Sequence, residues 1–233
     1  GEAMEPNLKD VVYILKKGVQ PDELRFSLRS VERNFPFNRV FFFCGRPEVI
    51  NPDVYVPFEQ IGATKWEKAT STYRKICESD VTEDFWLFND DFFIMERIDD
   101  LPYMYKGTLK ERIDDLRDRR GNSSYCMNLE GCRLELESLG FTSLDYALHV
   151  PMLINKQKAL ETLNTFKSPM FRSLYGNYAE VGGIKADDVK IYNASLPVQG
   201  QTLISTADAS FKYGRVGKII RDRFTEPSRW ETV

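Results

Sequence analysis

Residues 85–91 read FWLFNDD, an apolar run followed directly by an asparagine and two aspartates. Its four apolar residues, 85–88, have the length and aromatic content of a buried β-strand. Asn89, Asp90 and Asp91 then end the apolar run abruptly. Open parallel sheets bind ligands beyond the carboxyl ends of their strands, so the two carboxylates are expected at such a site. Hard oxygen ligands there suit Mg²⁺ or Mn²⁺ carrying a diphosphate, and the alternative is a polar turn that caps a helix.

The chain on either side of this stretch alternates between strand and helix patterns. Pro21 begins one helical pattern, with apolar residues at 24, 28 and 31, and residues 66–78 form a second. Apolar runs predict buried strands at 8–15, 39–44 and 54–58. This order predicts βαβ units, and therefore an α/β fold with a mostly parallel sheet flanked by helices.

The C-terminal half has a less regular pattern. Residues 109–120 are strongly charged and are expected to form an exposed helix or a mobile insertion, while 156–166 and 217–224 read as helices. No repeat or linker interrupts the chain, so residues 1–233 are expected to form one domain. Gly1 to Ala3 precede Met4 and are interpreted as a remnant of cloning.

Composition excludes several classes of protein. The 233 residues are 42% hydrophobic and 29% charged, which is typical of a globular chain and not of a disordered, coiled-coil or fibrous one. Lysine and arginine number 32 against 35 acidic residues, so no strong field attracts a polyanion. No apolar run approaches the roughly 20 residues of a membrane span. The four cysteines form no CxxC pair, which favours free thiols in a cytoplasmic protein.

His149 is the only histidine. It is followed by Val150 and Pro151 and lies among apolar residues, where a histidine is most often structural. If the chemistry needs a base near neutral pH, however, this is the one imidazole that the chain can supply.

Several cations are candidates for phosphate contacts. Arg25 and Arg29 share one helix face, Arg172 lies within Phe-Arg-Ser, and Lys65 and Lys68 flank the start of the second helical pattern. The planar arginine fork matches phosphate oxygens. The alternative for most of these side chains is a solvated helix face.

Six sequence blocks occur in a recognisable order: residues 10–13 (DVVY), 22–32 (DELRFSLRSVE), 85–93 (FWLFNDDFF), 149–151 (HVP), 171–173 (FRS) and 224–231 (FTEPSRWE). Together they resemble the Stealth family of sugar-phosphate transferases, which includes capsular polysaccharide phosphotransferases and the GlcNAc-1-phosphotransferase catalytic subunit. The resemblance covers most of the chain.

The resemblance implies a GT-A-like fold and transfer of hexose-1-phosphate from a nucleotide-diphosphate sugar, with UDP-sugar the expected donor. Asp90 and Asp91 would hold the metal, and Asn89 would bind the donor with Asp90. His149 would take the proton of an acceptor sugar hydroxyl, and Arg172 would stabilise the phosphoryl oxygens. Arg25, Arg29, Lys65 and Lys68 are further donor-binding candidates.

Two departures from the family pattern keep alternatives open. Lys16-Lys17-Gly18 replaces an acidic segment expected near the donor, and residues 63–70 differ from the family's second donor segment. Transfer of the sugar alone, to a glycan or to a modified phage DNA base, is one alternative. A non-catalytic sugar-binding module is the other. A glycan acceptor is favoured over nucleic acid.

Overall fold

The computed structural model describes residues 7–193 and 200–232, and its centre is a five-stranded sheet with the strand order β3-β2-β1-β4-β7. β1 (Asp10–Leu15), β2 (Val40–Cys44), β3 (Val54–Val56) and β4 (Asp84–Phe88) run parallel. Only β7 (Met152–Asn155), at one edge, is antiparallel to its neighbour β4. The expected mostly parallel α/β sheet is therefore confirmed.

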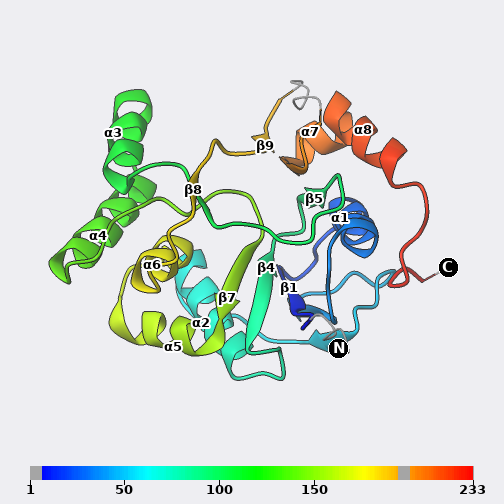
Figure 1. Ribbon diagram of the computed structural model, residues 1–233, viewed down its shortest axis with the longest axis horizontal. Helices are drawn as coiled ribbons and strands as arrows, with labels where there is room; N and C mark the ends of the chain where they lie inside the picture. Colours follow the sequence, from blue (N-terminus) through cyan, green and yellow to red (C-terminus); the bar gives the residue numbers. More distant parts are fainter. Residues whose placement is uncertain (1–6, 194–199, 233) are drawn as a thin grey trace, which may run out of the picture.

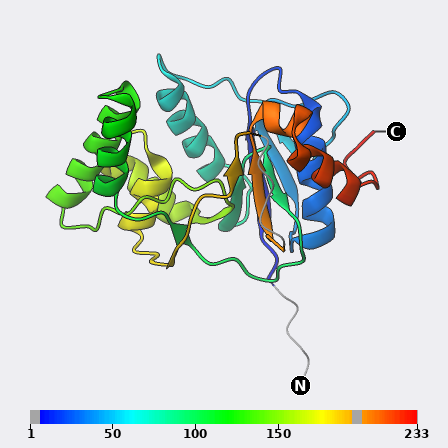
Figure 2. The same cartoon turned by 90° about the horizontal axis from the view of Figure 1, so that it is seen from above.

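Helices cover both faces of this sheet (Figures 1 and 2). α1 (Pro21–Asn34) packs on the face that carries Tyr13 and Phe88. α2 (Lys65–Cys77) and α5 (Lys156–Thr165) pack on the opposite face, which carries Phe85 and Leu87. Successive strand residues point to opposite faces, so the continuous apolar run of β4 is explained by burial on both sides.

A second, three-stranded sheet begins directly after the Asn-Asp-Asp segment. β5 (Phe92–Ile94) pairs antiparallel with β10 (Leu203–Thr206), and β10 pairs parallel with β9 (Lys190–Ile191). Residues of α7 (Asp208–Tyr213) and α8 (Arg215–Arg223) share a buried apolar cluster with this sheet. Through this pairing, the C-terminal part of the chain lies beside the residues that follow β4.

A pair of helices projects at the side of the molecule that carries α6 (Phe171–Tyr178) (Figure 1). α3 (Leu109–Arg120) is the charged helix expected from the sequence, and its exposed face carries i,i+4 ion pairs such as Lys110–Asp114. α4 (Ser124–Ser138) was not predicted. The two-stranded sheet of β6 (Met104–Tyr105) and β8 (Ile184–Lys185) completes the described strands.

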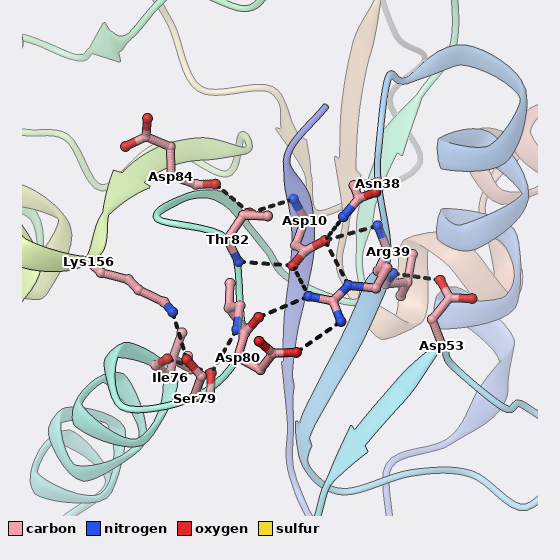
Figure 3. Close-up of polar contacts among 12 residues, drawn as sticks. Asp10, Asn38, Arg39, Asp53, Ile76, Ser79, Asp80, Thr82, Asp84 and Lys156 are labelled. Carbon is pink, nitrogen blue, oxygen red and sulfur yellow. Dashed lines mark hydrogen bonds and ion pairs between the residues drawn. The ribbon is translucent and has the colours of Figure 1, made fainter. Parts of the chain in front are cut away.

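A polar network ties together the amino ends of the central strands (Figure 3). The carboxylate of Asp10, fully buried, accepts hydrogen bonds from the Arg39 guanidinium at 3.0 Å, the Asn38 amide at 2.8 Å and the Thr82 backbone N–H at 2.9 Å. Arg39 also pairs with Asp80. Asp10 begins the first block of the family resemblance, yet it lies at the amino end of β1, at the opposite sheet edge from Asn89, so its contacts are structural.

All four cysteines are free thiols, and Cys126 and Cys132 are buried in the cluster between α3 and α4. None of the described helices has the length and apolar character needed to cross a membrane.

Candidate active site

The site lies where the strand order of the central sheet reverses. The chain proceeds from β1 to β2 and β3 on one side and returns to place β4 on the other side of β1. In open α/β sheets such a reversal leaves a crevice at the carboxyl ends of the two central strands. Lys16 and Lys17 follow β1, and Asn89, Asp90 and Asp91 follow β4, so both segments meet at this edge.

The carboxylates at this edge are crowded and incompletely neutralised. Asp91 Oδ2 pairs with Lys190 Nζ at 3.2 Å, whereas the buried Oδ1 has no hydrogen-bond partner among the described residues. Burial, together with the negative charges of Asp91 and Asp208, raises the pKa of Asp90 to about 6. The pKa of Glu23 is raised to about 9 by burial, by a hydrogen bond with Asp208 and by the negative charges of Asp90, Asp91 and Asp208. Glu23 is therefore protonated at neutral pH.

His149 is held by Asp188. Asp188 Oδ2 lies 2.7 Å from His149 Nδ1, and Asp188 Oδ1 accepts hydrogen bonds from the backbone N–H groups of His149 at 3.0 Å and Val189 at 2.8 Å. Burial alone would raise the pKa of Asp188, but the contacts with His149 outweigh it and lower that pKa. The carboxylate is therefore ionised, and it fixes the imidazole with Nε2 as the remaining ring nitrogen.

Arg172, in the first turn of α6, is a half-buried cation, and one of its guanidinium nitrogens is buried without a partner among the described residues. Its Nη1 donates to the carbonyls of Val150 at 2.7 Å and Leu148 at 3.2 Å, and its guanidinium lies 5.5 Å from the centre of the Phe92 ring. Its buried Nη2 has no partner among the described residues. Burial lowers the pKa of this guanidinium, as expected for a cation without a carboxylate bound to it.

A cavity of about 240 Å³ brings these groups together. Asn89, His149 and Arg172 all line it, and Tyr73 of α2 and Tyr125 of α4 complete its wall. Three residues that the sequence singled out separately, 23 to 83 positions apart along the chain, thus line one space.

A second cavity, of about 560 Å³, lies over the carboxyl ends of β1, β2 and β3. Lys17 and the exposed Lys68 line it, together with Tyr55 and Phe58. Lys65 is the first residue of α2, but its side chain lies outside the described residues.

The sequence suggested that Arg25 and Arg29 bind the donor phosphate, but in the structure both bind a carboxylate of the protein. Both guanidinium groups bind Glu231 at 2.8 Å, and Arg29 also donates to the Phe224 carbonyl. Neither residue lines the two cavities. They anchor the C-terminal segment on α1 and form no part of the proposed donor site.

Sequence reasoning missed Asp188, Lys190 and Asp208, which the second sheet brings to the edge of the first. One signal for Asp188 was available in the sequence. Two aspartates, Asp187 and Asp188, directly precede the strand-like residues 189–191, which places acids beside a strand end. Glu23 could not be distinguished from an ordinary acid in the first turn of a helix.

The carboxylates fit a divalent cation only in part. No group of three or more His, Cys, Asp or Glu residues converges as a metal site in the part of the chain that the structure describes. The unpartnered Asp91 Oδ1 and the raised pKa of Asp90 nevertheless indicate a pair that lacks positive charge. Two hard-oxygen ligands suit Mg²⁺ when a diphosphate and water complete its coordination.

Comparison with solved structures agrees with this architecture. The chain superimposes on the galactosyltransferase LgtC, solved with donor and acceptor sugar analogues, with a TM-score of 0.50 and 11% identity over 96% of this chain and 97% of that one. The protein has a GT-A fold. A glycosyltransferase from Streptococcus pneumoniae TIGR4, GlyE, has a TM-score of 0.35 and 9% identity over 94% of this chain and 50% of its own. No protein-family model matches the sequence, and neither does any curated protein.

Proposed function

We propose that the protein is a transferase that moves hexose-1-phosphate from a nucleotide-diphosphate sugar to a hydroxyl of an acceptor glycan, as the resemblance to the Stealth family implies. The observation that carries this proposal is the cavity lined by both His149, which Asp188 orients, and Arg172, whose Nη2 has no partner among the described residues. A base for a hydroxyl and a fixed cation for phosphoryl oxygens are the two groups that this transfer needs.

His149 acts as the base. With Nδ1–H donated to the ionised Asp188, Nε2 carries a lone pair and accepts the proton of the acceptor hydroxyl. The acceptor oxygen forms a bond to the β-phosphorus while the bond from that phosphorus to the bridging oxygen breaks. The nucleoside monophosphate leaves with the bridging oxygen, and the product is a sugar–phosphate–sugar diester.

Arg172 stabilises the charge on the transferred phosphoryl group. Two backbone carbonyls fix Nη1, so the orientation of Nη2 is set before the substrate binds. A preorganised donor of this kind acts most strongly away from water, and Nη2 of Arg172 is buried.

The donor diphosphate lies at the edge formed by Asn89, Asp90 and Asp91, and Lys17 and Lys68 contact the nucleotide part from the second cavity. Asp90 and Asp91 would hold Mg²⁺ or Mn²⁺, which, when bound, offsets the negative charge of the diphosphate. Lys190 keeps one Asp91 oxygen neutralised and orients the carboxylate. A cytoplasmic location, suggested by the four free thiols, belongs to the same proposal.

Transfer of the sugar alone is the second candidate. The GT-A fold shared with LgtC favours it, because that protein is a galactosyltransferase and its structure contains donor and acceptor sugar analogues. In this reaction the acceptor oxygen attacks the anomeric carbon and a nucleoside diphosphate leaves. His149 suits the deprotonation of a hydroxyl in both reactions, so the distinction depends on Arg172.

A panel of UDP- and GDP-sugars incubated with Mg²⁺ tests the proposal. At least one donor should yield a nucleoside monophosphate, and His149→Ala should lower its turnover by roughly 10²–10⁴-fold, the range for loss of a general base. Donor affinity should change little, since the base contacts the acceptor. Donor binding without any turnover would instead indicate a sugar-binding module.

A further inference from the structure

A groove of about 560 Å³ opens beside the cavity of His149. The beginning of α2 forms one wall and the first turns of α4 form the other, while Lys167 and Pro169 lie between them. Pro169 lines both spaces, and Ala69 and Tyr125 of the cavity are adjacent in sequence to Thr70 and Ser124 of the groove. The groove is therefore a continuation of the cavity away from His149.

The size of the cavity limits what it can hold. At about 240 Å³ it is smaller than the roughly 300–1,000 Å³ typical of pockets for drug-sized ligands, so it holds little more than one sugar ring. Tyr73, stacked on Phe171 with ring centres 4.0 Å apart, makes its wall rigid. A longer acceptor whose hydroxyl lies at His149 can continue along the groove, which shares Pro169 with the cavity.

The groove offers neutral polar contacts. The half-buried Asn128 amide forms no hydrogen bond with another described residue, and it can donate two and accept two. Lys167 Nζ forms no ion pair with the described residues, whereas the Glu67 carboxylate is already used in the capping box of α2. With one Glu and one Lys among its lining residues, the groove has no net charge that would select a polyanion.

We propose that this groove is an acceptor subsite that binds the second sugar of a neutral oligosaccharide. This inference rests on the proposed function, because the first sugar occupies the cavity with its hydroxyl at His149. Sugar hydroxyls both donate and accept, which matches the Asn128 amide, and the apolar face of a sugar ring packs on an aromatic side chain such as Tyr125 at the junction. In this proposal, α4 of the α3–α4 helix pair contributes to acceptor binding, because it forms one wall of the groove.

Binding of the fluorescently labelled protein to an array of neutral glycans, one to four sugars long, tests the subsite. The wild-type protein should be retained by glycans of two or more sugars and much less by the corresponding monosaccharides. Asn128→Ala and Lys167→Ala should each weaken retention on the longer glycans by about 2- to 10-fold, the loss expected for one hydrogen bond, without affecting monosaccharides. Asn164→Ala, an exposed asparagine on α5, is the matched control and should bind as wild type.

Two outcomes would overturn the subsite: no retention of any glycan by the wild-type protein, or unchanged retention by both groove variants. The result is independent of catalysis, because retention on the glycan array is measured without a nucleotide-sugar donor. Retention of longer glycans that depends on Asn128, in a protein that turns over no nucleotide sugar, would support the groove and refute the proposed transferase.

Discussion

The geometry around His149 shows how a lone histidine in an apolar stretch can be placed to act as the base that we propose. Its imidazole is not enclosed in the core but is partly exposed in a cavity, with one nitrogen bound to Asp188 at 2.7 Å. The arginines show that residues of one type can have different surroundings. Arg25 and Arg29 are satisfied by Glu231, whereas Arg172 keeps a buried nitrogen without a partner among the described residues. Sequence alone cannot separate these cases, because the decisive partners lie far away along the chain.

Asp188→Asn should lower kcat by roughly 10²–10⁴-fold, while donor affinity and melting temperature stay near the wild-type values. The asparagine keeps the shape but removes the charge that stabilises the protonated imidazole, and it can present the wrong hydrogen-bonding group to Nδ1. Steady-state kinetics, donor titration and thermal unfolding of the purified variant would measure this. Asp187→Asn, one residue earlier and exposed, is the control. A variant with full kcat would leave Asp188 as a structural residue only.

Donor binding in the presence of Mg²⁺ should weaken as the pH falls below about 6. The raised pKa of Asp90 means that its carboxylate takes up a proton in this range, and a protonated carboxyl group is a poor metal ligand. Affinity should fall by up to about tenfold between pH 6 and pH 5, as expected for one proton. Calorimetric titration of a UDP-sugar across pH 5 to 8 would show it, and Asp90→Asn should remove both the pH dependence and the metal dependence. Equal affinity across this range would exclude Asp90 as a metal ligand.

At the scale of elements, the buried parallel strands and the helices between them could be predicted, because burial on both faces leaves continuous apolar runs. α4 was missed although Cys126, Leu129, Cys132 and Leu136 form its buried stripe. The exposed Met127 and Leu134 blur that pattern. Periodicity also could not show that β7 runs antiparallel, or that β10 pairs with β5, since these depend on contacts distant in sequence.

Glu231→Gln should lower the free energy of unfolding by about 3 kcal/mol at pH 7, because it leaves Arg25 and Arg29 without their carboxylate. Burial opposes ionisation of Glu231, but hydrogen bonds from Arg29, the Ser228 N–H and Arg25 lower its pKa from 4.5 to about 2. The stabilisation is therefore complete above about pH 4.5 and is lost as the pH falls toward 2. Denaturant unfolding at pH 7 and pH 3 would show a smaller difference at the lower pH. Glu226→Gln, an exposed acid, is the control, and equal stability of Glu231→Gln and wild type at pH 7 would contradict the anchor.

At the scale of the whole molecule, two sheets meet at residues 89–91. The first supplies Asn89, Asp90 and Asp91, and the chain leading into β9 and β10 supplies Asp188 and Lys190. The sequence could place the first set, since its strands are local and regular. The second set could not be placed, because its position depends on the pairing of β10 with β5 and β9, which no pattern along the chain predicts. That residues 1–233 form one domain stays a prediction, although the dependence of the site on both sheets favours it.

A UDP-sugar radiolabelled at the β-phosphorus distinguishes transfer of phosphorus with the sugar from transfer of the sugar alone. The enzyme, Mg²⁺ and either water or an acceptor glycan would be incubated without phosphatase, and the products separated by chromatography. We expect the label to move to the sugar product and unlabelled UMP to be released. Label retained in UDP, with an unlabelled sugar product, would contradict this expectation and make the protein an ordinary glycosyltransferase.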